Sequence, residues 1–553
     1  MPARFAPKLL TVFKEGYGLP ELRADAVAGL TVAIVALPLS MAIAIASGVS
    51  PDRGLFTAIV GGFLVSLLGG SRFQIGGPAG AFIVLVAATV RAHGLDGLLL
   101  ATMLSGLMLT VLGLIRAGAF IRYMPYPVTV GFTAGIAVII FASQIKDLFG
   151  LTLLGPEPGE LAAKLGALIR AAPTANPQAI GLAVGVMVVI LGLKRFRPQW
   201  PGMLIAVTLA GVTAQVAQLD VVTIGERFGA LAQGLPAPRL PALGWDKVQA
   251  VLPSALSFTL LGAIESLLSA VVADSMTGRR HRPDTELIAQ GIANIGSALF
   301  GGIVVTGTIA RTATNVRSGA RGPVAGMLHA AFLLAFMVIA APLAAYIPLA
   351  ALAGLLAVVA WNMAEKHEFA VLLRASKADA AVLLTTFGLT LAKDLSTGIV
   401  AGFSLGALLF IHRMASQVEV QGLEDEPDGF DPVLTADRDI AVMKIAGAFF
   451  FGATAQVGAT LDEIGDRPKG YVLDLSEVRL LDSSGVAAIS GFARNAQRRG
   501  ARVYLAGADK AVRRALMAQG LTPPVVRYRS SAEAAVRALK APLSPPSDAA
   551  HPG

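Results

Sequence analysis

The chain has 553 residues, of which 55% belong to the AVILMFWYC set and 15% are charged, and its mean hydropathy is +0.68. This composition excludes a disordered chain, and the low proportion of charged residues excludes a soluble protein built from several hydrophobic cores. The absence of cysteine excludes disulfides and thiolate metal sites. The chain has 45 Lys and Arg residues against 36 Asp and Glu, and in a membrane protein such an excess of positive charge is typical of loops rather than of a nucleic-acid surface.

The chain therefore reads as a polytopic α-helical membrane protein with no nucleic-acid partner. Residues 1–24 are polar and basic. No cleavable signal peptide is visible, because the first apolar stretch, which starts near Ala26, has no A-x-A site after it and runs into further hydrophobic segments. Fourteen apolar segments follow and define a transmembrane domain over residues 25–413. Their approximate ranges are 25–46, 54–70, 78–91, 95–115, 125–146, 178–194, 201–218, 249–272, 285–300, 307–318, 323–341, 347–363, 377–393 and 396–413.

Two of these segments are short and interrupted. The third opens after "QIGGP", and the tenth opens at the end of "GGIVVTGT". Each is third in a set of seven, which predicts two repeats, about 25–218 and 249–413, inverted relative to each other in the membrane because seven is odd. Interrupted segments at matching positions favour a transporter whose substrate site lies between them.

The loop charges predict the orientation. One set of loops carries fourteen Lys and Arg residues, whereas the opposite set carries nine, although it includes the two longest loops. The positive-inside rule places the first set and both termini in the cytoplasm.

The composition changes beyond Arg413. An acidic linker over 414–436 leads to strand-like and helix-like patterns that alternate over 437–541, with helices at about 454–465, 484–499, 509–519 and 531–540. This alternation predicts a small cytoplasmic α/β domain. Residues 542–553 are rich in Pro and Ser and predict a disordered tail.

Glu265 is a carboxylate well inside segment eight. An intramembrane carboxylate must be paired, hydrated or protonated, so it is a candidate coupling residue for H⁺ or Na⁺. Ser269, one turn later, could supply a second oxygen to a cation. The alternative is a carboxylate that only bridges helices.

Arg311 lies near the start of short segment ten, where a helix N-terminus carries a partial positive charge. We expect the start of segment three to face it, at Pro78, Ala79, Gly80 and Ala81, and this arrangement selects an anion. The alternatives are that Arg311 snorkels or pairs with Glu265, and that the glycines pack helices. Pro38 kinks segment one, where it either lines the site with Ser40 or serves packing alone.

In the α/β domain, "DLSEVRLLDSSGVAAI" predicts a buried strand, a turn and a helix start. Ser483 is a candidate N-cap, and phosphorylation there would also suit a helix N-terminus. Common catalytic motifs are absent from the sequence and the six histidines do not cluster, so an enzyme is less favoured than a transporter. A receptor or scaffold is a third class, which solute flux would distinguish.

The chain resembles the sulfate permease family of anion transporters with a C-terminal STAS domain. The resemblance rests on "ADAVAGLTVAIVALPLSMAIAIASGVSP", "GGSRFQIGGPAGAF", "LGAIESLLSAVVAD", "GGIVVTGTIARTATNVRSGA" and "VLDLSEVRLLDSSGV". Within that family, "MTGRRHRPDTELIAQGIANI" is similar to the bacterial branch associated with C4-dicarboxylates.

The resemblance implies a core domain and a gate domain, a homodimer, and a regulatory protein partner for the STAS domain. It implies an anion site formed by the two segment starts, at Pro78 to Ala81 and at Thr306, Gly307, Thr308 and Ile309, flanked by Leu39 and Ser40. Arg311 would hold the anion, and Glu265 would handle the coupling ion. No resident metal or cofactor is implied.

Leu39 and Ile43 replace a Gln and a Tyr that many sulfate-transporting members carry, and Glu265 with Ser269 replaces the Asp and Thr of sodium-coupled bicarbonate members. The sequence therefore predicts a proton-coupled symporter of C4-dicarboxylates of the succinate, fumarate or aspartate class. The alternative is Na⁺-coupled transport of bicarbonate, or transport of sulfate or another inorganic anion.

Overall fold

The computed structural model describes residues 5–118, 124–155, 157–158, 160–198, 200–393, 395–415, 419–422, 439–449 and 468–541. The chain divides into two compact units, Met1–Ser404 and Leu405–Gly553. The first is helical apart from one short pair of strands, and the second is built on a five-stranded sheet. The helix predicted at 454–465, most of the 414–436 linker and the predicted disordered tail lie outside the described residues.

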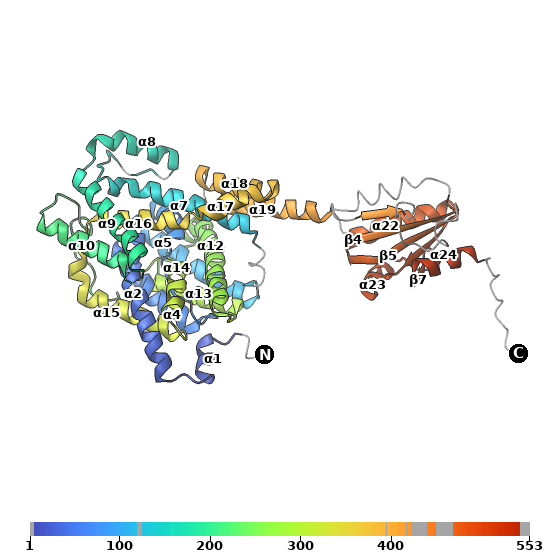
Figure 1. Cartoon of the computed structure of the whole chain (residues 1–553), viewed down its shortest axis with the longest axis horizontal. Coiled ribbons are helices and arrows are strands. Elements are labelled where there is room, and N and C mark those ends of the chain that lie inside the picture. Colours follow the sequence, from blue (N-terminus) through green and yellow to red (C-terminus); the bar gives the residue numbers. More distant parts are fainter. Residues whose placement is uncertain are drawn as a thin grey trace. The chain divides into compact units, whose positions relative to one another are not determined.

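Helices dominate the first unit (Figure 1). In chain order they are α1 Lys8–Lys14, α2 Leu19–Ala46, α3 Pro51–Phe56, α4 Gly62–Leu68, α5 Ile83–Leu114, α7 Tyr126–Leu148, α8 Leu161–Ala171, α9 Pro177–Phe196, α10 Gly202–Val216, α11 Ile224–Phe228, α12 Trp245–Thr277, α13 Pro283–Leu299, α14 Ile309–Arg317, α15 Val324–Ala344, α16 Leu349–Met363, α17 Lys366–Ala375, α18 Lys377–Ala392 and α19 Leu395–Ala415.

Each of the fourteen predicted segments coincides with helix, and within the described ranges nine helical stretches are long and apolar enough to cross a membrane. A π-helical turn over Thr57–Gly61 joins α3 to α4. Predicted segments three and four both lie in α5, where two helices meet at a kink at Gly94, whose φ of 66° and ψ of −171° are not helical. The sequence pattern did not predict the short helices α1, α8 and α17, because each is too short or too polar for a span.

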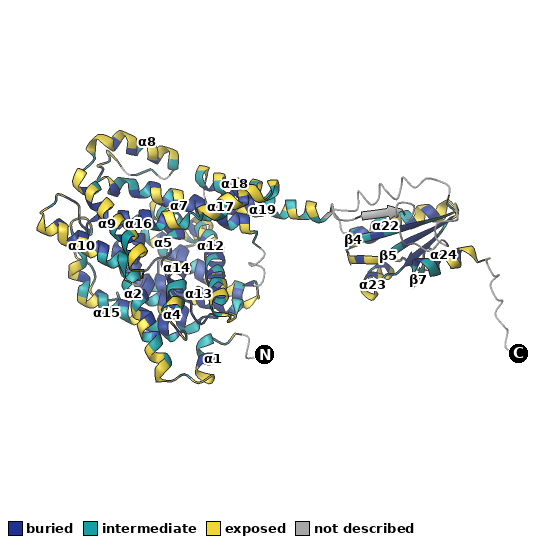
Figure 2. Ribbon diagram, in the orientation of Figure 1, coloured by how far each residue is buried: buried dark blue, intermediate teal, exposed yellow. Residues whose placement is uncertain are grey.

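The long helices pack in two sets. Helix α5 packs against α12 and α13, and α2 packs against α15; α7 packs against α16 and α18, and α9 against α10 and α16. Buried residues gather inside the unit, whereas α8 is largely exposed (Figure 2). Small residues permit close approach: a Cβ on Gly106 of α5 would lie 2.6 Å from the Gly291 carbonyl oxygen of α13.

The interrupted segments meet in extended conformation. Strand β1, Gly76–Gly77, pairs antiparallel with strand β2, Thr306–Gly307. Residues Gly80–Phe82 form a 3₁₀ turn that leads into α5, and α14 begins two residues after β2. The antiparallel pairing agrees with the predicted inversion of the two repeats.

The second unit is an α/β domain. Its sheet has the order β3 Glu419–Gly422, β4 Ile440–Phe449, β5 Gly470–Leu481, β6 Arg502–Ala506 and β7 Arg527–Arg529; β3 is antiparallel to β4, and the other pairs are parallel. Helices α22 Ser483–Arg498, α23 Lys510–Ala518 and α24 Ala532–Lys540 match the predicted ones. Strand β3 corrects the prediction for 414–436, because four residues assigned to the linker extend the sheet.

The predicted N-cap at Ser483 is wrong by one residue. Asp482 is the N-cap of α22, and its Oδ1 accepts a hydrogen bond of 2.8 Å from the Gly485 amide. Ser483 is the first helical residue, and its side chain is exposed. A carboxylate both caps the amides and faces the positive end of the helix dipole, so it takes the role in preference to the hydroxyl.

Candidate functional site

The candidate site is built around the pairing of β1 with β2. In this pair Gly76 lies opposite Gly307, and Gly77 lies opposite Thr306. A Cβ on Gly77 would lie 2.2 Å from Nη1 of Arg311, and a Cβ on Gly307 would lie 1.4 Å from Nε2 of Gln74. Glycine is therefore required at both positions so that polar side chains can lie against the backbone.

Side chains from other helices hold the extended backbone that precedes β1. The Thr312 hydroxyl accepts a hydrogen bond of 3.1 Å from the Ile75 amide, and Asn315 donates one of 2.9 Å to the Phe73 carbonyl. Gln74 donates to the Ser266 carbonyl of α12 at 3.1 Å. The backbone groups that no regular helix satisfies are thus paired inside the protein, as a membrane interior demands.

Arg311 lies in the first turn of α14, and 3% of its surface is exposed. Its Nη2 donates to the Ser40 hydroxyl of α2 at 3.1 Å and to the Pro78 carbonyl at 3.3 Å. Its Nη1 is buried and has no hydrogen-bond partner within the described part of the chain. One guanidinium therefore joins both interrupted segments to α2 and still has an unused donor.

Glu265 lies in the middle of α12, and its Oε2 is buried without a hydrogen-bond partner among the residues described. No ion pair joins Glu265 to Arg311 within the described ranges. The alternative in which Arg311 pairs with Glu265 is therefore not observed there. The Ser269 hydroxyl, predicted as a second oxygen for a cation, donates to the Thr312 hydroxyl at 3.0 Å, and this bond does not use its oxygen lone pairs.

The structure brings most of the predicted site residues together. Arg311 links Ser40 to Pro78 directly, and Leu39, Ala79 and Ala81 belong to one buried apolar cluster. Gly80 is partly exposed in the turn before α5. Thr306 and Gly307 form β2, and Thr308 donates its hydroxyl to the Ile75 carbonyl at 3.2 Å. Ile309 begins α14 and is 37% exposed.

Pro38 and Ser40 of α2 have different surroundings. Pro38 lines an apolar groove between α2, α10 and α15, whereas Ser40 bonds to Arg311. The kink proline and the site serine therefore serve different surfaces of one helix.

Sequence reasoning missed the polar residues that support the site. Asn294 of α13 holds Val305 through both backbone groups, donating to its carbonyl at 2.8 Å and accepting from its amide at 3.0 Å. Gln74, Thr312 and Asn315 have equivalent roles around β1. The signal available was a set of polar residues inside "FQIGGP", "RTATN" and "QGIANI". The partners of Gln74, Thr312 and Asn315 are far away in sequence, so no spacing indicates them.

The structure pairs two interrupted segments inside a bundle of membrane-spanning helices. A buried arginine lies at their junction, and the chain also has a separate α/β domain. These features define a membrane transporter for an anionic solute. The family comparisons specify the class further. The sulfate permease family matches residues 22–386, and the STAS domain matches residues 431–534. The chain belongs to the sulfate permease family.

Relatives and solved structures agree with this membership. The chain is 38% identical over 92% of its length to a Bacillus subtilis (strain 168) protein named "Putative sulfate transporter YvdB", of which it covers 95%. It is 30% identical over 90% of its length to the bicarbonate transporter BicA of Picosynechococcus sp., of which it covers 90%.

The fold is shared with the structure of murine Solute Carrier 26 family member A9, with a TM-score of 0.85, 17% identity, and coverage of 96% of this chain and 93% of that one. The transmembrane domain of a cyanobacterial BicA superposes with a TM-score of 0.61 at 30% identity, covering 70% of this chain and 98% of that one.

The chain is therefore a multi-pass anion transporter and not an enzyme. The relatives named here carry sulfate and bicarbonate in their names, so they favour the alternative of an inorganic anion over the predicted C4-dicarboxylate.

Proposed function

We propose that this chain transports a small inorganic oxyanion by alternating access, with bicarbonate as the first candidate and sulfate as the second. The anion would lie at the junction of β1 and β2, next to Arg311. The observation that carries the proposal is the buried Nη1 of Arg311, which has no hydrogen-bond partner among the described residues although Nη2 has two. An anion oxygen would satisfy that donor.

The charge of the site favours a monovalent anion. Arg311 supplies one full positive charge, and the start of α14 adds the partial charge of a helix N-terminus. A buried monovalent anion is neutralised by the guanidinium alone, whereas sulfate would need a further positive charge. Sulfate stays the second candidate because the 38% identical relative is named for it.

Glu265 is the proposed coupling residue. Its buried Oε2 lacks a partner in the described chain, so a cation can take that position. The cation depends on the anion: a proton moved with bicarbonate would deliver the equivalent of carbon dioxide and water, so useful coupling of bicarbonate requires Na⁺. Coupled sulfate uptake could use a proton.

The test is uptake of labelled bicarbonate, sulfate and succinate into proteoliposomes, under a Na⁺ gradient and, separately, under a pH gradient. The proposal predicts saturable bicarbonate uptake that depends on the Na⁺ gradient. Succinate uptake without uptake of either inorganic anion would contradict it and would support the C4-dicarboxylate prediction.

Three further assignments belong to the proposal. Both termini and the STAS domain lie in the cytoplasm, the chain forms a homodimer in a bacterial inner membrane, and the STAS domain regulates transport, with Ser483 as its exposed candidate for phosphorylation. Cysteine labelling from each side of the membrane tests the orientation. Labelling at residue 483 from the outer side only would contradict it.

A further inference from the structure

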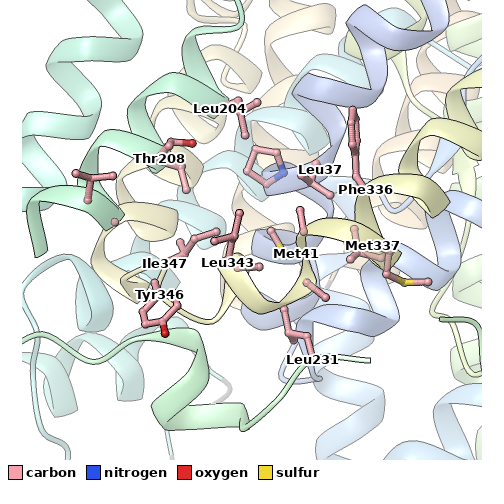
Figure 3. A pocket seen from close by; sticks show the side chains of 18 of the residues that line it. Leu37, Met41, Leu204, Thr208, Leu231, Phe336, Met337, Leu343, Tyr346 and Ile347 are labelled. Atoms are coloured by element: carbon pink, nitrogen blue, oxygen red, sulfur yellow. The ribbon is translucent and has the colours of Figure 1, made fainter. Parts of the chain in front are cut away.

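An apolar groove with a volume of about 590 Å³ lies between α2, α10 and α15 (Figure 3). Its size falls within the range of small-molecule sites, about 300–1,000 Å³. Leu37 and Met41 come from α2, Leu204 from α10, and Phe336 and Leu343 from α15. The groove is separate from the junction of β1 and β2, and the proposed transport cycle does not use it.

The surroundings of the groove limit what can fill it. Helices α2 and α15 are long and apolar enough to span a membrane, and α10 is a shorter apolar helix. The groove runs into apolar residues that face outwards: Val212 is 54% exposed, Val216 is 80% exposed and Leu343 is 70% exposed. It is thus continuous with the lipid-facing surface of a multi-pass membrane protein, where the surrounding medium is hydrocarbon.

The groove has three polar residues: Thr208 lies within α10 beside Leu204 (Figure 3), and the other two lie near helix ends. Gln215 lies one residue before α10 ends, and Tyr346 lies two residues after α15 ends. Figure 3 shows Tyr346 and Ile347 at one end, away from Leu204 and Phe336. An amide and a phenol at the ends of membrane helices are suited to the polar part of a lipid, and the apolar remainder is suited to its chain.

We propose that this groove is a binding site for one phospholipid, with an acyl chain along its apolar length and the glycerol ester region near Gln215 and Tyr346. The site is placed to influence transport. Leu37 and Met41 contact the groove from the same helix turns whose Ser40 bonds to Arg311. Helix α10 packs most extensively with α9, which belongs to the other set, so the bound chain contacts both sets of helices.

The test is photocrosslinking in proteoliposomes of phosphatidylethanolamine and phosphatidylglycerol that contain phosphatidylethanolamine with a diazirine in one acyl chain. Adducts are mapped by mass spectrometry. The outward-facing residues Val184 and Val188 of α9, which are 46% and 63% exposed, report ordinary contact with bulk lipid. We expect several-fold more adducts per residue in the groove than on α9.

Gly211→Phe is the groove-filling variant, because a Cβ at Gly211 approaches nothing closer than 3.5 Å and the position lines the groove. Leu209→Phe is the matched control, since Leu209 is on the same helix, is 50% exposed and does not line the groove. We expect groove adducts to fall to the α9 level in Gly211→Phe and to stay at the parent level in Leu209→Phe.

Three results would overturn the proposal: groove adducts no more frequent than α9 adducts, unchanged groove adducts in a monodisperse Gly211→Phe protein, or labelling by a diazirine fatty acid but not by the phospholipid. No anion is present in the experiment. Failure of the crosslinking experiment would therefore leave the proposed transport function untouched, and failure of the anion-uptake experiment would leave the proposed lipid site untouched.

Discussion

At the scale of single residues, Arg311 is the charged group around which the candidate anion site is built. It lies in the first turn of α14 and donates hydrogen bonds to one residue of α2 and to one carbonyl of the first interrupted segment. One side chain therefore connects three elements. A guanidinium suits this role because its donors form a planar fork that can bind protein and anion together.

Removing the charge at this position should weaken anion binding. A hydrogen bond to a charged group is worth about 1.5–3 kcal/mol, so Arg311→Ala should raise the Kd for bicarbonate about tenfold to a hundredfold. Arg311→Lys should restore part of the affinity. Arg317→Ala, at the exposed end of α14, is the control. Equal calorimetric affinities in all four proteins would remove Arg311 from the site.

Glu265 should separate coupling from binding. In Glu265→Gln the amide keeps the shape of the side chain but cannot become an anion, so a coupling cation loses its charge partner. We expect Na⁺-driven accumulation of anion to be lost while exchange of internal for external anion continues. Accumulation at the parent level would show that this carboxylate serves helix assembly alone.

At the scale of elements, the pairing of β1 with β2 depends on residues that have no side chain. Gly77 faces the guanidinium, and the bulk of one methyl group at this position would occupy the place of Nη1. The element and the site are therefore built together, because the absence of a Cβ at Gly77 leaves the space that Nη1 of Arg311 occupies.

Gly77→Ala should displace Arg311 without unfolding the protein, since the clash involves the end of a flexible side chain. We expect a lower anion affinity with a nearly unchanged melting temperature. Gly185→Ala on α9, where a Cβ meets nothing within 4 Å, is the control. A Gly77→Ala protein that binds anion like the control would show that the position of Nη1 is unimportant.

The cap of α22 makes a prediction within the α/β domain. Loss of an N-cap costs about 1 kcal/mol, so Asp482→Ala should increase amide hydrogen exchange in the first turn of α22 about fivefold. Ser483→Ala should leave the exchange rate unchanged, because the Asp482 carboxylate makes the capping bond. If Ser483→Ala raised the rate and Asp482→Ala did not, the assignment of the cap would be reversed.

Sequence patterns predicted the elements well and their connections poorly. Apolar runs of sufficient length indicated each membrane segment, because burial in hydrocarbon requires them. The polar support of the site was missed, since Asn294, Thr312 and Asn315 act on partners brought close only by the fold. Asp482 was missed for a different reason: two adjacent residues can each cap a helix, and only the backbone geometry at the first turn distinguishes them.

At the scale of the whole molecule, the helical unit contains two sets of helices with different packing partners. One set includes α2, α5, α12 and α15, and carries the interrupted segments; the other includes α7, α9, α16 and α18. Such a division permits one set to move against the other while each keeps its own contacts, which is the physical requirement for alternating access.

Counterflow tests the central claim most directly, because it requires a carrier that exposes one anion site to each side in turn. Proteoliposomes loaded with unlabelled bicarbonate are diluted into a trace of labelled bicarbonate. The account predicts that the label rises transiently above its equilibrium level inside the vesicles, and that Arg311→Ala strongly reduces the rise. A monotonic approach to equilibrium in the parent protein, as through an open pore, or no uptake of label by a folded protein, would contradict the account.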